Sequence, residues 1–239
     1  MNSFNNKKRL KFIITLGTGT FGSSKSNQIT LEGYRATADI EKAGGVQLST
    51  LKGKIYGVSQ SDMNSCVTLQ WRPRNIIQNT VEVYAIDGDQ ESIVFKGMII
   101  NAWPDFYSMP DVFLNIFAQS AYAGQIQAVP PISFKGAIEV STVMSKIAKS
   151  MELTLENNDV RSKVTDIYLA NTSMEQVREL ARMAGIDFYI DIDTLAITPP
   201  NAPRQYSIVP EISKESGLIG YPTFDGIGVS LRCLFNPEI

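Results

Sequence analysis

Histidine is absent from this chain of 239 residues. Histidine is the commonest general base and the commonest metal ligand in proteins, and every Ser-His or Cys-His nucleophile requires it. This absence argues against a hydrolase or a metalloenzyme more strongly than any other feature of the sequence.

Cysteines and long apolar runs are scarce as well. Cys66 and Cys233 are the only cysteines. They are too few and too far apart for a disulfide framework, so we expect buried or half-buried thiols in a protein made in a reducing cytosol. The sequence has no run of about 18 apolar residues, so no membrane span is predicted. Met1–Arg9 lacks the apolar segment of a secretory signal.

The composition that remains is typical of a globular protein, with 44% hydrophobic and 19% charged residues. The length suits one large domain or two ordinary ones. Residues 1–60 hold nine Lys and Arg against three Asp and Glu, a balance of +6, whereas residues 151–239 hold seven against thirteen, a balance of −6. The two ends can attract each other within a chain or between copies, or they can form two solvated faces.

Residues 8–104 favour β-strands separated by turns. Apolar stretches of strand length recur at short intervals, and Asp87-Gly88 is a hairpin signal. One helix is predicted over Ser59–Val67, with Ser59 or Ser61 as its N-cap. Many short strands at regular spacing predict a sandwich or barrel. The predicted strands are 10–16, 28–40 (one bent strand or two short ones), 46–58, 80–86 and 92–100.

The pattern changes after Trp103-Pro104. A helix is predicted from Val140 to Met151, because apolar residues recur there at helical spacing. Ser173–Gln176 matches a capping box that starts a second helix, and Gly185 closes it. The predicted strands of this part are 112–121, 186–192 and 195–198.

These elements predict a mainly β, α+β protein. Its parts are a β domain at 1–108, an α+β insert with helices packed on a small sheet at 109–205, and the beginning of a second β unit at 206–239.

The segment Gly17–Gly22 matches the dinucleotide-binding fingerprint, and Asp39 and Glu41 lie at the distance expected for a ribose contact. That chemistry needs a helix N-terminus at the third glycine, aimed at the pyrophosphate. A polar segment and an alternating strand follow instead. We therefore predict a flexible or interaction loop, and a nucleotide-binding enzyme using Gly17–Gly22 is the alternative function.

Acidic residues offer two further candidates. Asp187, Asp191 and Asp193 lie at even spacing, so they can share one strand face and bind a hard cation. Their spacing is not that of a helix–loop–helix calcium site, and a solvated strand face explains them as well. Asp87 and Asp89 are predicted to be turn residues rather than a catalytic pair.

The remaining polar and aromatic candidates also have structural explanations. Ser141 and Ser173 are predicted to be helix caps, not nucleophiles. Trp71, Trp103 and Tyr107 are candidates for recognition by exposed aromatics or for packing at a domain junction. No catalytic, cofactor or metal site is predicted.

The segment Ser216–Pro237 is the most specific of the chain. Gly226 and Gly228 permit a tight turn, and a strand follows with alternate apolar residues on one face. We expect this strand to begin a second β unit rather than to complete the first. Its apolar face consists of Val229, Leu231, Cys233 and Phe235.

The same segment resembles a Gly-Leu-Ile-Gly-x-Pro stretch leading to a Leu-Phe or Leu-Asn-Pro strand end in phage tail baseplate hub proteins. This group includes the hub and late-control proteins of contractile-tail myophages and is related to the hub part of type VI secretion spikes. Weaker similarities are Val94–Gly97, Val112–Ile116, Gly136–Ser141, Glu156–Asn158 and Leu195–Pro200.

The resemblance implies a structural, non-enzymatic protein of the virion tail. Each subunit of such hubs contributes two tube-like β-barrels, so that three subunits form a pseudo-six-fold ring around the DNA channel. The implied partners are further copies in a homotrimer, the tail spike and the tail tube or a tube initiator, with the tape-measure protein and the baseplate wedge as further candidates. Family members continue past Asn-Pro to complete the second barrel, so we expect that barrel to be completed outside this sequence, which ends at Ile239.

Overall fold

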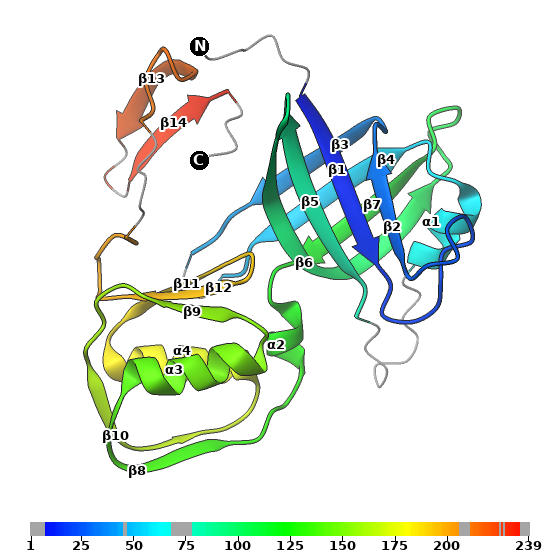
Figure 1. Ribbon diagram of the computed structural model, residues 1–239. Helices are drawn as coiled ribbons and strands as arrows, with labels where there is room; N and C mark the ends of the chain where they lie inside the picture. Colours follow the sequence, from blue (N-terminus) through cyan, green and yellow to red (C-terminus); the bar gives the residue numbers. More distant parts are fainter. Residues whose placement is uncertain are drawn as a thin grey trace.

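One curled antiparallel sheet contains seven of the strands (Figure 1). The computed structural model describes residues 8–44, 47–67, 78–205, 211–224, 226 and 228–234. The strands of this sheet run in the order β2-β1-β5-β6-β7-β4-β3. Their bounds are β1 Lys8–Thr15, β2 Gln28–Glu32, β3 Ala36–Glu41, β4 Thr50–Tyr56, β5 Thr80–Asp87, β6 Gln90–Asp105 and β7 Phe113–Gln119.

Apolar residues at every second position explain why these segments form strands and which face of the sheet lies inside the curl. Phe12 and Ile14 of β1 are fully buried, as are Leu51 and Ile55 of β4, whereas the residues that alternate with them, such as Lys52 and Lys54, are more exposed. The buried faces of the strands meet in one apolar core inside the curl. Each large apolar side chain buried there contributes about 1.5–3 kcal/mol to stability.

Two predicted turns have the expected backbone. Gly88, at the hairpin between β5 and β6, has a φ of 63°, which glycine adopts without strain. Gly33 has a φ of 81° and divides the predicted 28–40 stretch into β2 and β3, so the two-strand alternative is the one the structure adopts. Since β2 and β3 are the two outer strands of the sheet, this corner lies where the curl is open.

Helix α1 (Gln60–Cys66) confirms the helix predicted over Ser59–Val67. Ser59 is the N-cap, and its Oγ accepts a hydrogen bond of 3.2 Å from the Asp62 backbone N–H. Met63 and Cys66 of the helix are buried in the core of the curled sheet.

Two helices lie between two small sheets in the α+β part of the molecule (Figure 1). Helices α3 (Val140–Ser150) and α4 (Ser173–Ala184) bury the apolar faces that their spacing predicted. The short helix α2 (Tyr122–Ile126) leads into this part. One sheet pairs β8 (Ile132–Glu139) with β10 (Lys163–Leu169), and the other has the order β11-β12-β9, with bounds Asp187–Asp191, Thr194–Thr198 and Thr154–Asn157.

The observed N-termini of α3 and α4 differ from two sequence predictions. The N-cap of α4 is Thr172, one residue before the predicted Ser173, and its side chain accepts a hydrogen bond from the Glu175 N–H. Ser173 is buried instead, with its Oγ 3.0 Å from Ser150 Oγ. Ser141 does not cap α3, since it lies inside that helix. Gly185 closes α4 in the left-handed conformation, as predicted.

The curled sheet continues past the boundary predicted between residues 108 and 109. Strand β7 follows that boundary, yet it pairs with both β6 and β4. We therefore propose a division into the same three domains, with residues 113–119 assigned to the first β unit. The mainly β, α+β class is as predicted.

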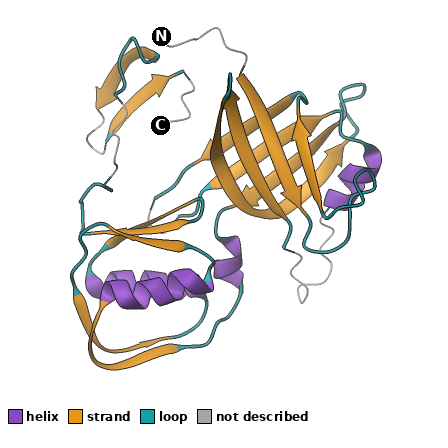
Figure 2. Cartoon of the chain, in the orientation of Figure 1, coloured by secondary structure: helices purple, strands orange, loops and turns teal. Residues whose placement is uncertain are grey.

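The last two strands form a separate hairpin (Figures 1 and 2). β13 (Leu218–Phe224) pairs antiparallel with β14 (Val229–Cys233), and neither joins another sheet within the described residues. β14 therefore does not complete the seven-stranded sheet. Val229 and Leu231 are exposed, Cys233 is half-buried and Phe235 lies outside the described residues.

Candidate interaction surfaces

The Gly17–Gly22 segment is held against helix α1. Its Phe21 is buried, and the Gly17 N–H donates a hydrogen bond of 3.0 Å to Asn79 Oδ1. An added Cβ at Gly17 would lie 2.9 Å from the backbone of Gln78, so the close approach requires glycine. After Gly22 the chain turns and enters β2, with no helix between them.

A buried carboxylate fastens this loop to the helix. Asp62 is only 4% exposed, and its Oδ1 accepts hydrogen bonds from both the N–H and the Oγ of Ser23, at 3.2 and 2.9 Å. Its Oδ2 accepts a third bond from Ser59 Oγ at 2.7 Å. The glycines therefore serve chain packing, and the helix that the nucleotide alternative requires is not there. Sequence reasoning missed Asp62, although Ser59-x-x-Asp62 is a capping pattern.

The three aspartates considered as candidate cation ligands are held by separate partners. Asp191 lies 3.4 Å from Lys42 Nζ, and Asp193 lies 2.8 Å from Lys96 Nζ. Asp187 accepts a hydrogen bond of 3.0 Å from the Asn201 N–H. Within the described residues no group of three metal-binding side chains occurs. These lysines belong to the curled sheet and its loops, so the aspartates help to join it to the α+β part.

Arg204 holds two carboxylates on the α+β side of this joint. Its guanidinium donates two hydrogen bonds to the Glu156 carboxylate, at 2.8 and 2.7 Å, and lies 3.7 Å from Asp191. The bonds from Arg204 lower the pKa of Glu156, against the opposing effect of partial burial. We call this set of charges, Lys42, Lys96, Glu156, Asp191, Asp193 and Arg204, the ionic seam.

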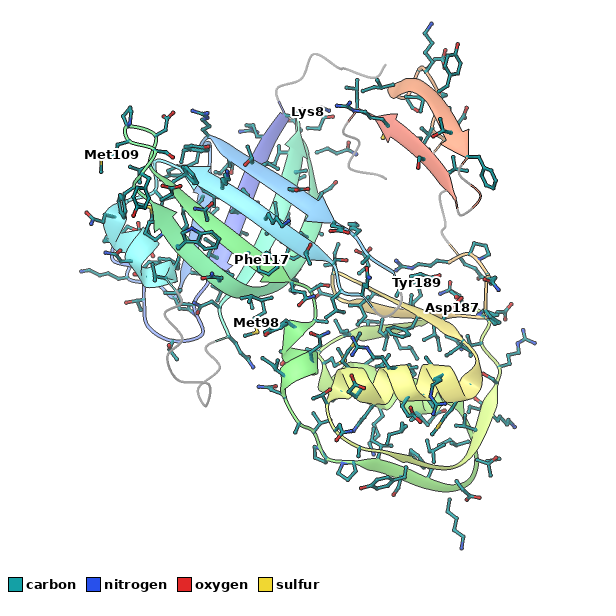
Figure 3. The ribbon with its side chains drawn as sticks, turned by 180° about the vertical axis from the view of Figure 1, so that it is seen from behind. Lys8, Met98, Met109, Phe117, Asp187 and Tyr189 are labelled. Atoms are coloured by element: carbon teal, nitrogen blue, oxygen red, sulfur yellow. The ribbon has the colours of Figure 1, made fainter. Side chains whose placement is uncertain are left out.

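Backbone and apolar contacts complete the seam. Ser49 and Ser120 exchange two hydrogen bonds, of 2.9 and 3.1 Å, and neighbouring Leu48 is buried in the core of the α+β part. Tyr189 faces the curled sheet (Figure 3). An added Cβ at Gly44 would lie 3.0 Å from its ring. A cavity of about 380 Å³ between these groups is lined by Lys42, Tyr189 and Arg204 among others.

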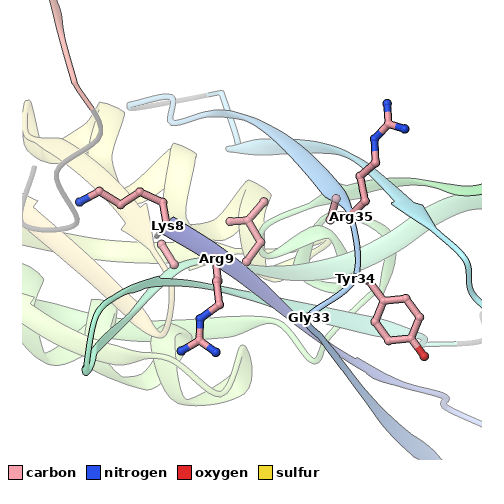
Figure 4. Close-up of a pocket in the computed structure, with 8 residues that line it drawn as sticks. Lys8, Arg9, Gly33, Tyr34 and Arg35 are labelled. Atoms are coloured by element: carbon pink, nitrogen blue, oxygen red, sulfur yellow. The ribbon is translucent and has the colours of Figure 1, made fainter. Parts of the chain in front are cut away.

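A second concave surface lies at the open corner of the curled sheet (Figure 4). It measures about 440 Å³ and is lined by the start of β1, by Ala85 and by residues 33–36. The cations around it have partners: Lys8 pairs with Asp87, and Arg9 lies 3.1 Å from Glu32. Asp87 thus ends β5 at the hairpin, as predicted, and also holds Lys8.

Two of the three candidate aromatics, Trp103 and Tyr107, lie within the described residues. Trp103 is 44% exposed and Tyr107 is fully exposed, so both are available for contact. Trp71 lies outside the described residues. The larger exposed apolar surface is on the C-terminal hairpin, where Tyr221 is 94% and Phe224 is 75% exposed. Sequence reasoning identified β14 as a strand needing a partner but did not single out Tyr221 or Phe224.

These surfaces suit protein contacts better than catalysis. Ion pairs and burial account for the pKa shifts at Glu156 and at Cys66, whose pKa burial raises to about 12. The two concave surfaces described above are lined by salt-bridged cations and apolar strand residues. Within the described chain, no helix is long and apolar enough to cross a membrane.

A comparison with known protein families identifies the family of this chain. The family described as baseplate hub gp41 matches residues 28–239. The chain belongs to this family. As a baseplate hub protein it is a structural component of the phage tail, and the predicted relationship and its location in the virion are confirmed. No curated protein matches the sequence.

Solved structures of tail proteins show partial similarity to this hub protein. The prophage MuSo2 43 kDa tail protein from Shewanella oneidensis is 13% identical, with a TM-score of 0.49 over 79% of this chain and 53% of that one. The tail protein from Neisseria meningitidis MC58 is 16% identical, with a TM-score of 0.48 over 82% and 56%. Prophage tail protein gp18 from Listeria monocytogenes EGD-e is 14% identical, with a TM-score of 0.46 over 84% and 56%. This chain thus spans just over half the length of these proteins.

Proposed function

We propose that three copies of this hub protein form a ring that joins the tail tube to the central spike and surrounds the channel through which DNA passes. The observation that carries the proposal is the match of the baseplate hub family to residues 28–239. The ring adapts a six-fold tube to a three-fold spike because each copy contributes two β units. The curled sheet is one unit, and the β13–β14 hairpin belongs to the other.

The surfaces of the chain support a role in assembly. The hairpin exposes large apolar side chains on both strands, and two-stranded hairpins are marginally stable without a further partner. Contiguous exposed apolar residues mark protein–protein contacts. The partners in this proposal are the neighbouring copies, the spike, and the tube or its initiator, with the tape-measure protein and baseplate wedge at the periphery. Binding rests on strand edges and needs no catalytic chemistry.

The mass of the full chain in solution tests this proposal. We expect native mass spectrometry and light scattering to show a species of three times 26.4 kDa, alone or on addition of the spike protein. Negative-stain images of that species should show a ring. A chain that stays monomeric at every concentration, with the spike protein present, contradicts the proposal.

A further inference from the structure

Within the described residues, the outer edges of β2 and β3 and the start of β1 lack a partner strand. Two of these edges, the start of β1 and the outer edge of β3, border the groove at the open corner. The ladder between β1 and β2 ends at Lys11 opposite Glu32, so among the described strands residues 8–10 pair only with β5. β3 pairs with β4 alone, and its outer edge has no partner strand among the described residues. Free edges of this kind accept an added strand through backbone hydrogen bonds.

The core is incompletely covered between these two edges. Leu10 of β1 and Ala36, Ala38 and Ile40 of β3 pack against the buried core but remain only partly buried themselves. The groove at the open corner gives access to this place (Figure 4). An extended strand with alternate apolar residues would cover the exposed part of the core and satisfy the free backbone groups of β3.

β14 has the pattern that this place requires. Its residues Val229, Leu231 and Cys233 fall on one face, while Ser230 and Arg232 fall on the other. Val229 is 62% and Leu231 is 42% exposed, and β14 pairs only with β13 within the described residues. One edge of β14 is therefore available for a second partner.

The charges of the two strands are complementary. Asp39 and Glu41 lie on the outward face of β3, and both are exposed. Neither carboxylate forms an ion pair with another described residue. Lys52, opposite Asp39 in the β3–β4 ladder, is the cation nearest in register. If β14 lies beside β3 with its apolar face inward, Arg232 lies on the same face as the two carboxylates. Cross-strand pairs of opposite charge stabilise such a pairing.

We propose that β14 of one copy adds to the free edge of β3 in a second copy. Val229 and Leu231 cover the partly buried side of β3, and Arg232 lies beside Asp39 and Glu41. The contact joins two different surfaces, so repeating it builds a ring when the rotation between copies closes. The inference rests on the proposed ring and names the surfaces through which its copies meet. It also uses the opposite charges of the two ends of the sequence.

A mixed disulfide experiment tests the contact. One copy carries Ser230→Cys and the other carries Asp39→Cys or Glu41→Cys, all in a Cys233→Ser background, and the two are mixed and oxidised. We expect a linked pair of chains with one of the two β3 variants. Lys163→Cys, exposed on β10, is the matched control and should give no linked pair.

Each alternative outcome is decisive. If the mixed copies stay unlinked while Ser230→Cys and Asp39→Cys in one chain form an internal bridge, β14 pairs within its own chain and the proposal is wrong. If a ring of three copies forms without any β14–β3 link, the proposed function stands and this inference fails. If no ring and no link form, both fail.

Charge reversal provides an independent readout. We expect Arg232→Glu to weaken association between copies about tenfold, because two carboxylates then face a third. Asp39→Lys with Glu41→Lys should restore association to the Arg232→Glu chain. Arg161→Glu, an exposed reversal in the α+β part, is the control and should change nothing. An Arg232→Glu chain that associates like the wild type overturns the charge assignment and, with it, the proposed contact.

Discussion

Asp62 shows how one buried side chain joins a loop to a helix. Burial alone raises the pKa of its carboxyl, but hydrogen bonds from Ser59 and Ser23 outweigh that effect, and the pKa lies below its usual value of 3.8. These bonds favour the charged form in the folded protein. Ionisation of Asp62 therefore adds to stability.

Replacing this carboxylate should destabilise the protein in a pH-dependent way. We expect Asp62→Asn to lower the free energy of unfolding by about 1–3 kcal/mol near neutral pH, because a charged acceptor of three bonds is lost. Since the folded-state pKa is the lower one, the contribution is complete above the unfolded-state value and disappears as the pH falls through the folded-state value. Urea unfolding across that acidic range measures it. Asp89→Asn, at an exposed turn, is the control, and a difference that grows on acidification contradicts the account.

The two cysteines should differ sharply in reactivity. Burial, and secondarily the charge of Asp62, raises the pKa of Cys66 to about 12, so almost no thiolate forms at neutral pH. Cys233 is half-buried on the hairpin. We expect iodoacetamide to label one thiol in the folded protein, at Cys233, and two after denaturation, as peptide mass spectrometry can show. Labelling of Cys66 in the folded state would contradict its burial.

At the scale of elements, the start of helix α4 distinguishes two adjacent hydroxyl groups. Thr172 accepts a hydrogen bond from the Glu175 N–H, whereas the Ser173 hydroxyl lies buried against Ser150. Both fit a capping pattern in the sequence. Only the backbone conformation separates them, since Thr172 is extended, with a φ of −80° and a ψ of 158°.

Removal of the cap should weaken the helix by a measurable amount. We expect Thr172→Ala to cost about 1 kcal/mol, because the Glu175 N–H loses its partner, and Thr172→Ser to restore most of it. Thermal unfolding followed by circular dichroism provides the measurement. Ser141→Ala, at the predicted cap that α3 does not use, should be close to neutral. A Ser141 variant as damaging as the Thr172 variant would reverse this assignment.

Strong alternation and clear helical spacing made most of the curled sheet and both long helices predictable. The strands β8 and β10 were missed because their alternation of apolar and polar residues is interrupted. The interruptions lie at Gly136, with a φ of 81°, and at Asp166, with a φ of 49°. β7 was identified as a strand, but its pairing with β4 is a long-range contact that no local pattern encodes. The opposite net charges of the two ends of the sequence were the only sign of the ionic seam. Its individual pairs, such as Lys42 with Asp191, could not be predicted because the fold brings them together.

At the scale of the whole molecule, the ionic seam holds the curled sheet and the α+β part together. Arg204 is its most buried charge, with a side chain 15% exposed and two bonds to Glu156. Bidentate pairing of this kind is stronger than an isolated surface pair.

Arg204→Ala should destabilise the α+β side of that joint. We expect a loss of about 1.5–3 kcal/mol, because hydrogen bonds to a charged group are lost and the Glu156 carboxylate keeps no guanidinium partner. Since these bonds lower the pKa of Glu156, the effect should fade as the pH falls through that lowered value. Urea unfolding at neutral and acidic pH measures both. Arg161→Ala, an exposed pair, should stay near zero. An effect independent of pH contradicts the role of Glu156.

The central claim is that copies of this chain form the ring at the hub of a tail baseplate. Cryo-electron microscopy of purified phage tails tests it most directly, because the chain can be traced at the junction of tube and spike. The account predicts three copies around the axis, with the curled sheets and the C-terminal β units alternating in a pseudo-six-fold ring around an open channel. Density showing the chain as single copies at the periphery, or absent from that junction, would contradict it.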